Sequence, residues 1–197
     1  MGEDWVRRKE EKREGRFRMP VIVKIAAGLL LLCILCIVGY VVYMQANYYR
    51  IEDYAELEVE NGQKKTLKTG ETYTAVTYNI GFGAYGPDYS FFMDTGEMDD
   101  GTPTTGKYGK AISKESVEAN TEGAAGELEQ LHADFMLLQE VDVDADRSYH
   151  INQMEKLKNR FPDYGNVFAY NFHSAYLFYP FSDPHGAVDA GLLNFSR

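Results

Sequence analysis

Cysteine is scarce in this sequence: only two occur among 197 residues, Cys33 and Cys36. In a soluble loop their C-x-x-C spacing would suggest a redox or metal-binding pair. Here both lie inside an uncharged apolar stretch, where two thiols on adjacent helical turns behave as small apolar side chains. A disulfide scaffold is therefore excluded. The rest of the chain contains no cysteine, and we expect it to have no disulfide partner.

Proline is also scarce, and basic residues are outnumbered by acidic ones. Six prolines and 18 glycines without a repeat exclude collagen, and 45 % hydrophobic with 25 % charged residues excludes wholesale disorder. Residues 1–24 hold eight basic and five acidic residues, which gives them a formal net charge of +3. The whole chain has a formal net charge of −10, so residues 25–197 carry −13. This excess of acidic residues argues against a broad nucleic-acid-binding surface, because such surfaces are usually basic.

One long apolar run separates the basic head from the acidic body. Residues 25–44 (IAAGLLLLCILCIVGYVVYM) contain no charged side chain. Twenty helical residues span roughly 30 Å, which is the thickness of the hydrocarbon core of a bilayer. We therefore expect a transmembrane signal anchor over residues 20–44, preceded by a basic head at 1–19. The positive-inside rule predicts a single-pass cell-membrane protein with a cytoplasmic N-terminus and an extracytoplasmic C-terminal domain.

A cleaved signal peptide is the alternative interpretation of this run. Signal peptides have a shorter apolar region and small residues before the cleavage point. Near the exit from the run stands Met44-Gln45-Ala46, with Met where a small residue belongs. An uncleaved anchor is therefore favoured.

The exported body alternates strand and helix patterns, which predicts a mixed α/β (α+β) domain. Residues 45–71 are expected to form a linker and a hairpin, because Asn61-Gly62 is a strong two-residue turn signal. Between the predicted elements lie a long loop at 83–110 and an acidic loop at 142–148. The predicted elements are a core strand at 72–80, a helix around 117–131, a strand at 135–141 buried on both faces, a helix at 151–161, and strands at 167–171 and 190–196.

Two of these strands end in polar side chains. Asn79 closes the first strand, and Glu140 stands near the end of the apolar run at 135–141. The carboxyl ends of strands are where ligand sites form in open α/β sheets. A carboxylate at such an edge is costly to bury unless it is paired or bound to a metal. Glu140 offers the hard oxygen that suits Mg²⁺, and the Asn79 amide can orient a water, a phosphate oxygen or a neighbouring carboxylate.

The order and spacing of these motifs resemble a known family. TYNIG at 77–81, LLQEVD at 137–142 and GAVDAGLLNFSR at 186–197 are similar to the first half of the endonuclease/exonuclease/phosphatase superfamily, which has the DNase I-like fold. The resemblance covers residues 72–197, and the N-x-G and Q-E motifs are each short. It implies the N-terminal half of a two-sheet sandwich flanked by helices.

The resemblance also implies an activity. Family members hydrolyse phosphodiesters or phosphomonoesters with a divalent metal, which polarises the phosphoryl oxygen. The residue matching Glu140 would bind Mg²⁺, or another divalent cation such as Mn²⁺, and the residue matching Asn79 would position the site and the scissile phosphate. The family's later Asp-x-Asn and Ser-Asp-His motifs do not occur within the 197 residues. We therefore expect this chain to be an N-terminal part that is inactive alone.

Other polar residues have weaker claims. Arg147 could contact a substrate phosphate, although pairing with the aspartates at 142, 144 and 146 is the better interpretation. His173 and His185 lie in an aromatic stretch, where a surface or packing role outweighs a place in the cleft.

The sequence thus predicts a membrane-anchored, extracytoplasmic, metal-dependent phosphoesterase. Its substrate would be a lipid headgroup, a small phosphoester or nucleic acid. The alternative is a non-catalytic surface domain that keeps the fold for binding, with residues 83–110 as its contact surface.

Overall fold

The computed structural model describes residues 20–62 and 64–197. The chain divides into two units, Met1–Ala46 and Asn47–Arg197, and each is described by itself. The predicted basic head at 1–19 lies outside the described residues.

The first unit contains one apolar helix, α2 (Val21–Ala46), none of whose residues is buried. Its 26 residues would extend about 39 Å at 1.5 Å per residue, which is long enough to cross a bilayer. A membrane span and a signal sequence both fit a helix of this length and composition near the N-terminus. The predicted apolar segment at 20–44 is therefore helical, and continues to Ala46.

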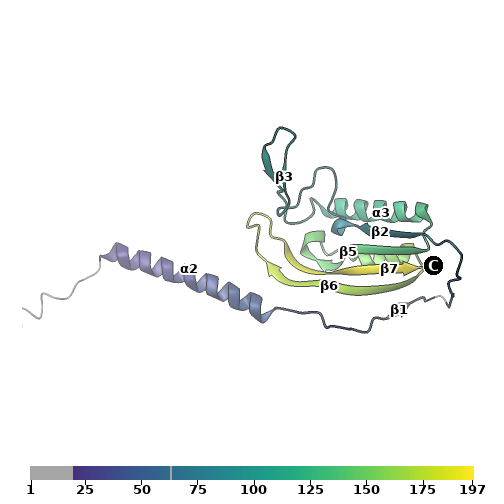
Figure 1. Ribbon diagram of the computed structural model, residues 1–197. Coiled ribbons are helices and arrows are strands. Elements are labelled where there is room, and N and C mark those ends of the chain that lie inside the picture. The colour runs from purple at the N-terminus through teal and green to yellow at the C-terminus, as the bar shows by residue number, and fades with distance from the viewer. Residues whose placement is uncertain (1–19, 63) are drawn as a thin grey trace, which may run out of the picture. The chain divides into compact units, whose positions relative to one another are not determined.

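The second unit is a mixed α/β domain with one sheet of five strands and one small sheet of two (Figure 1). The large sheet has the order β1-β6-β7-β5-β2, in which only β2 and β5 are parallel to each other. Its strands are β1 (Val59–Glu60), β2 (Ala75–Asn79), β5 (Phe135–Ala145), β6 (Gly165–Leu177) and β7 (Gly186–Ser196); the small sheet pairs β3 (Thr95–Glu97) with β4 (Pro103–Thr105).

Two helices, α3 (Lys114–Leu131) and α4 (Gln153–Arg160), cover one face of this sheet. The start of α3 is fixed by a capping box, in which Ser113 Oγ accepts from Ser116 N at 3.1 Å. Asn152 caps α4 through its side-chain oxygen. The predicted apolar spacing is confirmed in α3, although Leu131 in its last turn is exposed. The core between helices and sheet includes Ala124, Leu128, Met136, Leu138, Leu157, Leu193 and Phe195.

The opposite face of the sheet is open in the described part of the chain. Along β5, Met136 and Leu138 are fully buried under the helices, whereas Leu137 between them is 42 % exposed. Phe135, Leu137 and Val167 line an apolar hollow of about 240 Å³ on that face. The prediction that residues 135–141 are buried on both faces is therefore wrong, because both helices pack on the same side. The strand at 72–80 is likewise an edge strand, β2, rather than a core strand.

Three connections differ from the sequence prediction. Val59 pairs with Val167 of β6, so the described residues around Asn61-Gly62 form no hairpin with Lys64 or Lys65. The predicted acidic loop at 142–148 is mostly strand, because β5 continues to Ala145 by pairing with β7, and a 3₁₀ turn (η2, Asp146–Ser148) follows. The predicted loop at 83–110 contains the β3–β4 hairpin, which projects from the domain (Figure 1).

Adjacent leucines on β5 provide a matched test of this one-sided core. Leu138→Ala removes a fully buried side chain beneath the helices and should destabilise the protein by about 2–5 kcal/mol. Leu137→Ala, on the open face, should cost much less. Urea unfolding of the full chain in detergent micelles, followed by near-UV circular dichroism, measures both. Equal losses for the two variants would contradict an open second face.

Candidate functional site

The predicted residues Asn79 and Glu140 lie side by side, Asn79 at the carboxyl end of β2 and Glu140 in the middle of β5, which continues to Ala145. The expectation that Glu140 stands at the end of its strand is therefore wrong, because the following acidic residues also pair with β7. The parallel register pairs Asn79 with Gln139, which places Glu140 one residue beyond. Asn79 Nδ2 donates a hydrogen bond to Glu140 Oε1 at 2.9 Å. The amide therefore orients the carboxylate, one of the roles predicted for Asn79, and leaves Glu140 Oε2 available to a ligand.

A β-bulge places the Glu140 side chain in this position. The register between β5 and β7 shifts between Leu138 and Val141, and Glu140 has a φ of 54°. A left-handed backbone at a residue other than glycine costs about 1–3 kcal/mol, and such residues cluster at functional sites. Bulges next to active sites re-aim side chains in this way.

A tight turn that contains Gly81 and Gly83 follows Asn79 and forms one wall of the site. Asn79 Oδ1 accepts a hydrogen bond from Gly81 N at 2.8 Å, and η1 (Gly81–Gly83) continues from there. Gly81 has a φ of 55°, and a Cβ at this position would lie 2.6 Å from the Tyr85 ring. Gly83 has a φ of 69°, and a Cβ there would lie 2.7 Å from Gln153 Nε2. Only glycine fits either position without a shift of its neighbours.

A buried ion pair lies beneath this turn. Arg147 donates from Nε and Nη2 to the two carboxylate oxygens of Asp142, at 3.1 and 2.7 Å. The Asp142 side chain is fully buried and the Arg147 side chain is 8 % exposed. The guanidinium carbon also lies 4.1 Å from the centre of the Phe82 ring. Arg147 thus pairs with an aspartate, as the favoured interpretation predicts, and it packs next to the turn. Its role as a substrate contact stays a prediction.

Hydrogen bonds extend from this ion pair to both helices. Asp142 N donates to Gln153 Oε1 at 3.0 Å, and Gln153 Nε2 donates to Thr121 Oγ1 at 2.8 Å. Asn120 of α3 donates to Gly83 O at 2.9 Å. The turn that carries Gly81 is therefore tied to β5, α3 and α4 together.

Above the turn, Asn79 and Glu140 line an open hollow of about 350 Å³ with Tyr78, Ile80, Gly81 and Tyr85. Burial, followed by the nearby charges of Asp94 and Glu140, raises the pKa of Tyr85 to about 12. Its hydroxyl is therefore neutral at physiological pH, and it donates its proton to Asp94 Oδ2 at 3.4 Å.

The histidines lie outside this hollow. His185 is buried, and its Nδ1 lies 2.5 Å from Gly109 O; burial lowers its pKa. His173 pairs with Asp189 on β7. His150 lies 2.5 Å from Asp144 Oδ1, and this contact raises the pKa of the imidazole. The packing and surface roles favoured for His173 and His185 agree with these positions.

The donor set fits one mode of metal binding. Within residues 20–62 and 64–197, no three His, Cys, Asp or Glu side chains come together in a way that could hold a metal. Mg²⁺ is commonly bound by one or two carboxylates, several waters and substrate phosphates rather than by an all-protein cage. A single oriented carboxylate at an open hollow suits that mode, with Glu140 as the ligand and Asn79 as its support.

Sequence reasoning missed two features of the site, the bulge at Glu140 and the position of Tyr85. Tyr85 is one of 15 tyrosines, and no motif distinguishes it from the others. The positive φ at Glu140 follows from the pairing of β5 with both of its neighbours, and the sequence around it reads as a regular apolar strand.

Removal of the Arg147 guanidinium tests its packing role. Arg147→Met leaves the buried Asp142 carboxylate without its partner and should destabilise the protein by about 3–5 kcal/mol. The double variant Arg147→Met with Asp142→Leu should recover most of this loss, because it leaves no buried charge. Urea unfolding of the full chain in micelles measures both. Unchanged stability of Arg147→Met would contradict the packing role.

Comparisons with known protein families, characterised proteins and solved structures find no match to this chain.

Proposed function

We propose that this chain belongs to a membrane-anchored, extracytoplasmic phosphoesterase that depends on a divalent cation. The hydrogen bond from Asn79 to Glu140 carries this proposal. The bond joins the two motifs of the family resemblance at the edge of the sheet where ligand sites form. α2, which is long and apolar enough to cross a bilayer, supports the anchor.

The open face of the sheet supports the finer fold proposal, half of a DNase I-like sandwich. In such a sandwich the face that carries Leu137 and Phe135 would pack against a second sheet. Its apolar hollow and its exposed leucine are the features expected of a surface that another layer covers.

Each residue around the hollow has a chemical role in this proposal. Glu140 Oε2 would hold Mg²⁺ or Mn²⁺, which supplies charge stabilisation to a phosphoryl oxygen. Asn79 fixes the rotamer of the carboxylate, so that no reorganisation is needed when substrate binds. The neutral Tyr85 hydroxyl donates to Asp94 in the structure, and it would donate to a second phosphoryl oxygen only by exchanging that partner. The acidic body disfavours long nucleic acid as the substrate and favours a lipid headgroup or a small phosphoester.

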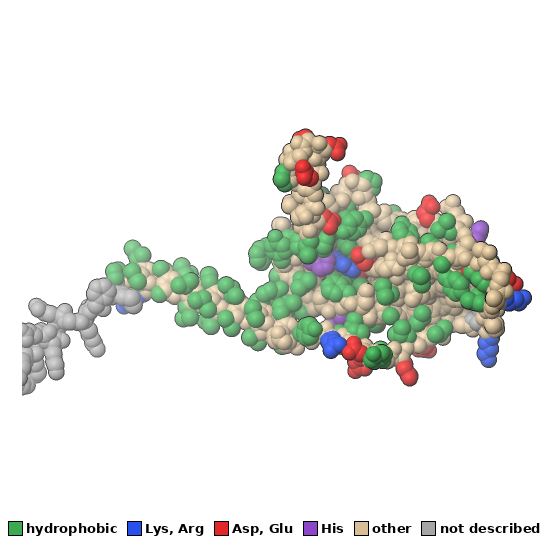
Figure 2. All heavy atoms as spheres, viewed as in Figure 1, with side chains coloured by type: hydrophobic (Ala, Val, Ile, Leu, Met, Phe, Trp, Pro, Cys, Tyr) green, Lys and Arg blue, Asp and Glu red, His purple; other side chains and the backbone are tan. Residues whose placement is uncertain are grey.

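A second candidate function is the non-catalytic surface binding domain. The projecting β3–β4 hairpin favours it, because acidic side chains gather at its tip (Figure 2). Such a domain would keep the fold and bind a ligand without hydrolysing it.

Exchange of one carboxylate tests the phosphoesterase proposal. Glu140→Gln, introduced into the protein encoded by the whole reading frame in membranes, should lower kcat on the order of 100-fold or more, because it removes the charged ligand. Hydrolysis of bis-p-nitrophenyl phosphate with Mg²⁺ measures this rate. Glu129→Gln is the matched control, since Glu129 pairs with Arg160 on the surface of α3, and it should leave the rate unchanged.

Two results would count against the phosphoesterase. A full Mg²⁺-dependent rate in Glu140→Gln would remove Glu140 from the site. Absence of hydrolysis in the unmodified protein, together with measurable binding of the phosphodiester, would favour the binding domain.

A further inference from the structure

The connection between β6 and β7 presents aromatic side chains to solvent. Phe181 is 85 % exposed, Tyr179 60 % and Phe178 49 %. Figure 2 shows hydrophobic side chains gathered over this connection. Large apolar side chains that are clustered and exposed mark contact surfaces rather than random surface composition.

Contacts from the body of the domain fix the backbone of this connection. Asp183 Oδ2 accepts from Gly109 N at 3.1 Å, and Asp183 Oδ1 lies 3.4 Å from Lys110 Nζ. Asp183 N donates to Pro180 O at 3.1 Å. The Tyr179 ring packs edge-on against Phe92, with 5.4 Å between the ring centres. The aromatic tip is thus preorganised, and a surface that binds it would have little conformational entropy to offset.

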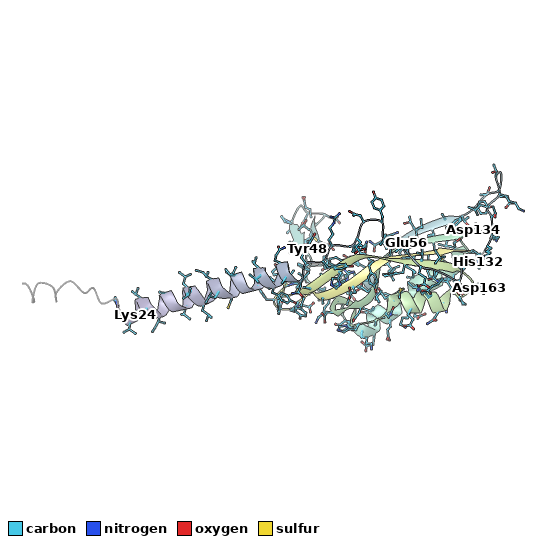
Figure 3. The ribbon with its side chains drawn as sticks, turned by 90° about the horizontal axis from the view of Figure 1, so that it is seen from below. Lys24, Tyr48, Glu56, His132, Asp134 and Asp163 are labelled. Carbon is cyan, nitrogen blue, oxygen red and sulfur yellow. The ribbon has the colours of Figure 1, made fainter. Side chains whose placement is uncertain are left out.

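The aromatic tip lies beyond the carboxyl end of β6, at the end of the sheet toward which β2 and β5 also run. β6 runs parallel to β5, because both are antiparallel to β7. The carboxyl end of β6, where the connection starts, therefore lies on the same side as the carboxyl end of β5, whereas β2 ends further back, opposite Gln139. The opposite edge carries His132 and Asp134 (Figure 3).

The first residues of the domain unit also lie on this side of the domain. The domain unit begins at Asn47, directly after the last residue of α2. Tyr49 packs against His173 near the carboxyl end of β6, with 5.0 Å between the ring centres. Figure 3 shows Tyr48 at the end of the domain away from His132. The entering segment and the aromatic tip thus lie at the same end of the sheet, toward which the strands that carry Asn79 and Glu140 run.

We propose that the aromatic tip Phe178–Phe181 inserts into the headgroup region of the membrane that α2 spans, as a second membrane contact. Tyrosine and phenylalanine suit this region because their apolar rings enter the lipid while polar groups stay hydrated. Insertion turns the carboxyl end of β2, which carries Asn79, toward the bilayer, and this favours a phosphoester in a lipid headgroup as the substrate. This inference rests on the anchor of the proposed function.

The charge of the domain predicts which lipids the aromatic tip can insert into. The formal net charge of residues 25–197 is −13, so an anionic surface repels the domain as a whole. Lys110, the cation next to the tip, is already paired with Asp183. Insertion is therefore driven by the aromatic rings, and occurs in zwitterionic phosphatidylcholine without anionic lipid.

Tryptophan fluorescence in proteoliposomes tests this contact with the full chain. The sequence contains one tryptophan, Trp5, which is replaced in a Trp5→Phe background. Into this background Phe181→Trp, Leu131→Trp or Leu35→Trp is introduced singly. Leu131 is the matched control, because it is exposed at the end of α3 on the opposite edge; Leu35 reports on α2. Each variant is reconstituted in phosphatidylcholine with and without brominated acyl chains, which quench only a lipid-embedded indole.

The expected result is loss of most emission at positions 35 and 181, a blue shift at 181, and no loss at 131. Quenching at 35 without quenching at 181 would overturn the inference and leave the anchor intact. Emission at 181 that is blue-shifted but unquenched would also overturn it, since protein contact such as a second copy would then cover the tip. Absence of quenching at 35 would overturn the anchor itself. Glu140→Gln should leave quenching at 181 unchanged, so that the membrane contact is tested separately from the role of Glu140 in the proposed function.

Discussion

The buried ion pair between Asp142 and Arg147 is the interaction on which the arrangement around the hollow depends. A fully buried carboxylate needs a charged partner and good hydrogen bonds, and Arg147 supplies both in a bidentate contact. The guanidinium lies against Phe82, the central residue of the glycine turn. The same aspartate meets Gln153 of α4 through its backbone. One pair therefore joins β5, η1 and α4, and fixes the turn that follows Asn79.

This fixed turn explains why the site lies on a rigid edge although its backbone is strained. The left-handed φ at Glu140 is unfavourable by itself, and it persists because strand pairing on both sides of the bulge determines the backbone. The free-energy cost of this backbone conformation is consistent with a carboxylate that must point toward a ligand. The exposed aromatic tip at Phe181 and the first residues of the domain lie at the end of the sheet toward which β5 and β6 run. A membrane-bound substrate is consistent with this arrangement.

Much of the element order was predictable from sequence because local signals agreed with the tertiary structure. The spacing of Val117, Thr121 and Leu128 predicted α3. Asn79 and Glu140 lie together as expected, although the parallel register of β2 with the middle of β5 brings them together rather than a common strand end. Burial was less predictable, because the run at 135–141 is equally apolar whether one or both faces are covered. Arg147 could not be placed with certainty, since its burial depends on Phe82, which a distant part of the chain brings to it. The prediction of a hairpin at Asn61-Gly62 was wrong because Val59 pairs with β6 instead.

The central claim is that Glu140, supported by Asn79, is where a divalent cation meets this domain. Paramagnetic broadening by Mn²⁺ in NMR spectra of the ¹⁵N-labelled full chain in micelles tests it most directly. If Glu140 is the ligand, the side-chain amide of Asn79 and the backbone N–H of Gly81 should broaden first, and Glu140→Gln should abolish this effect. Broadening centred instead on the acidic tip around Asp99 and Asp100, with Asn79 unaffected, would contradict the claim.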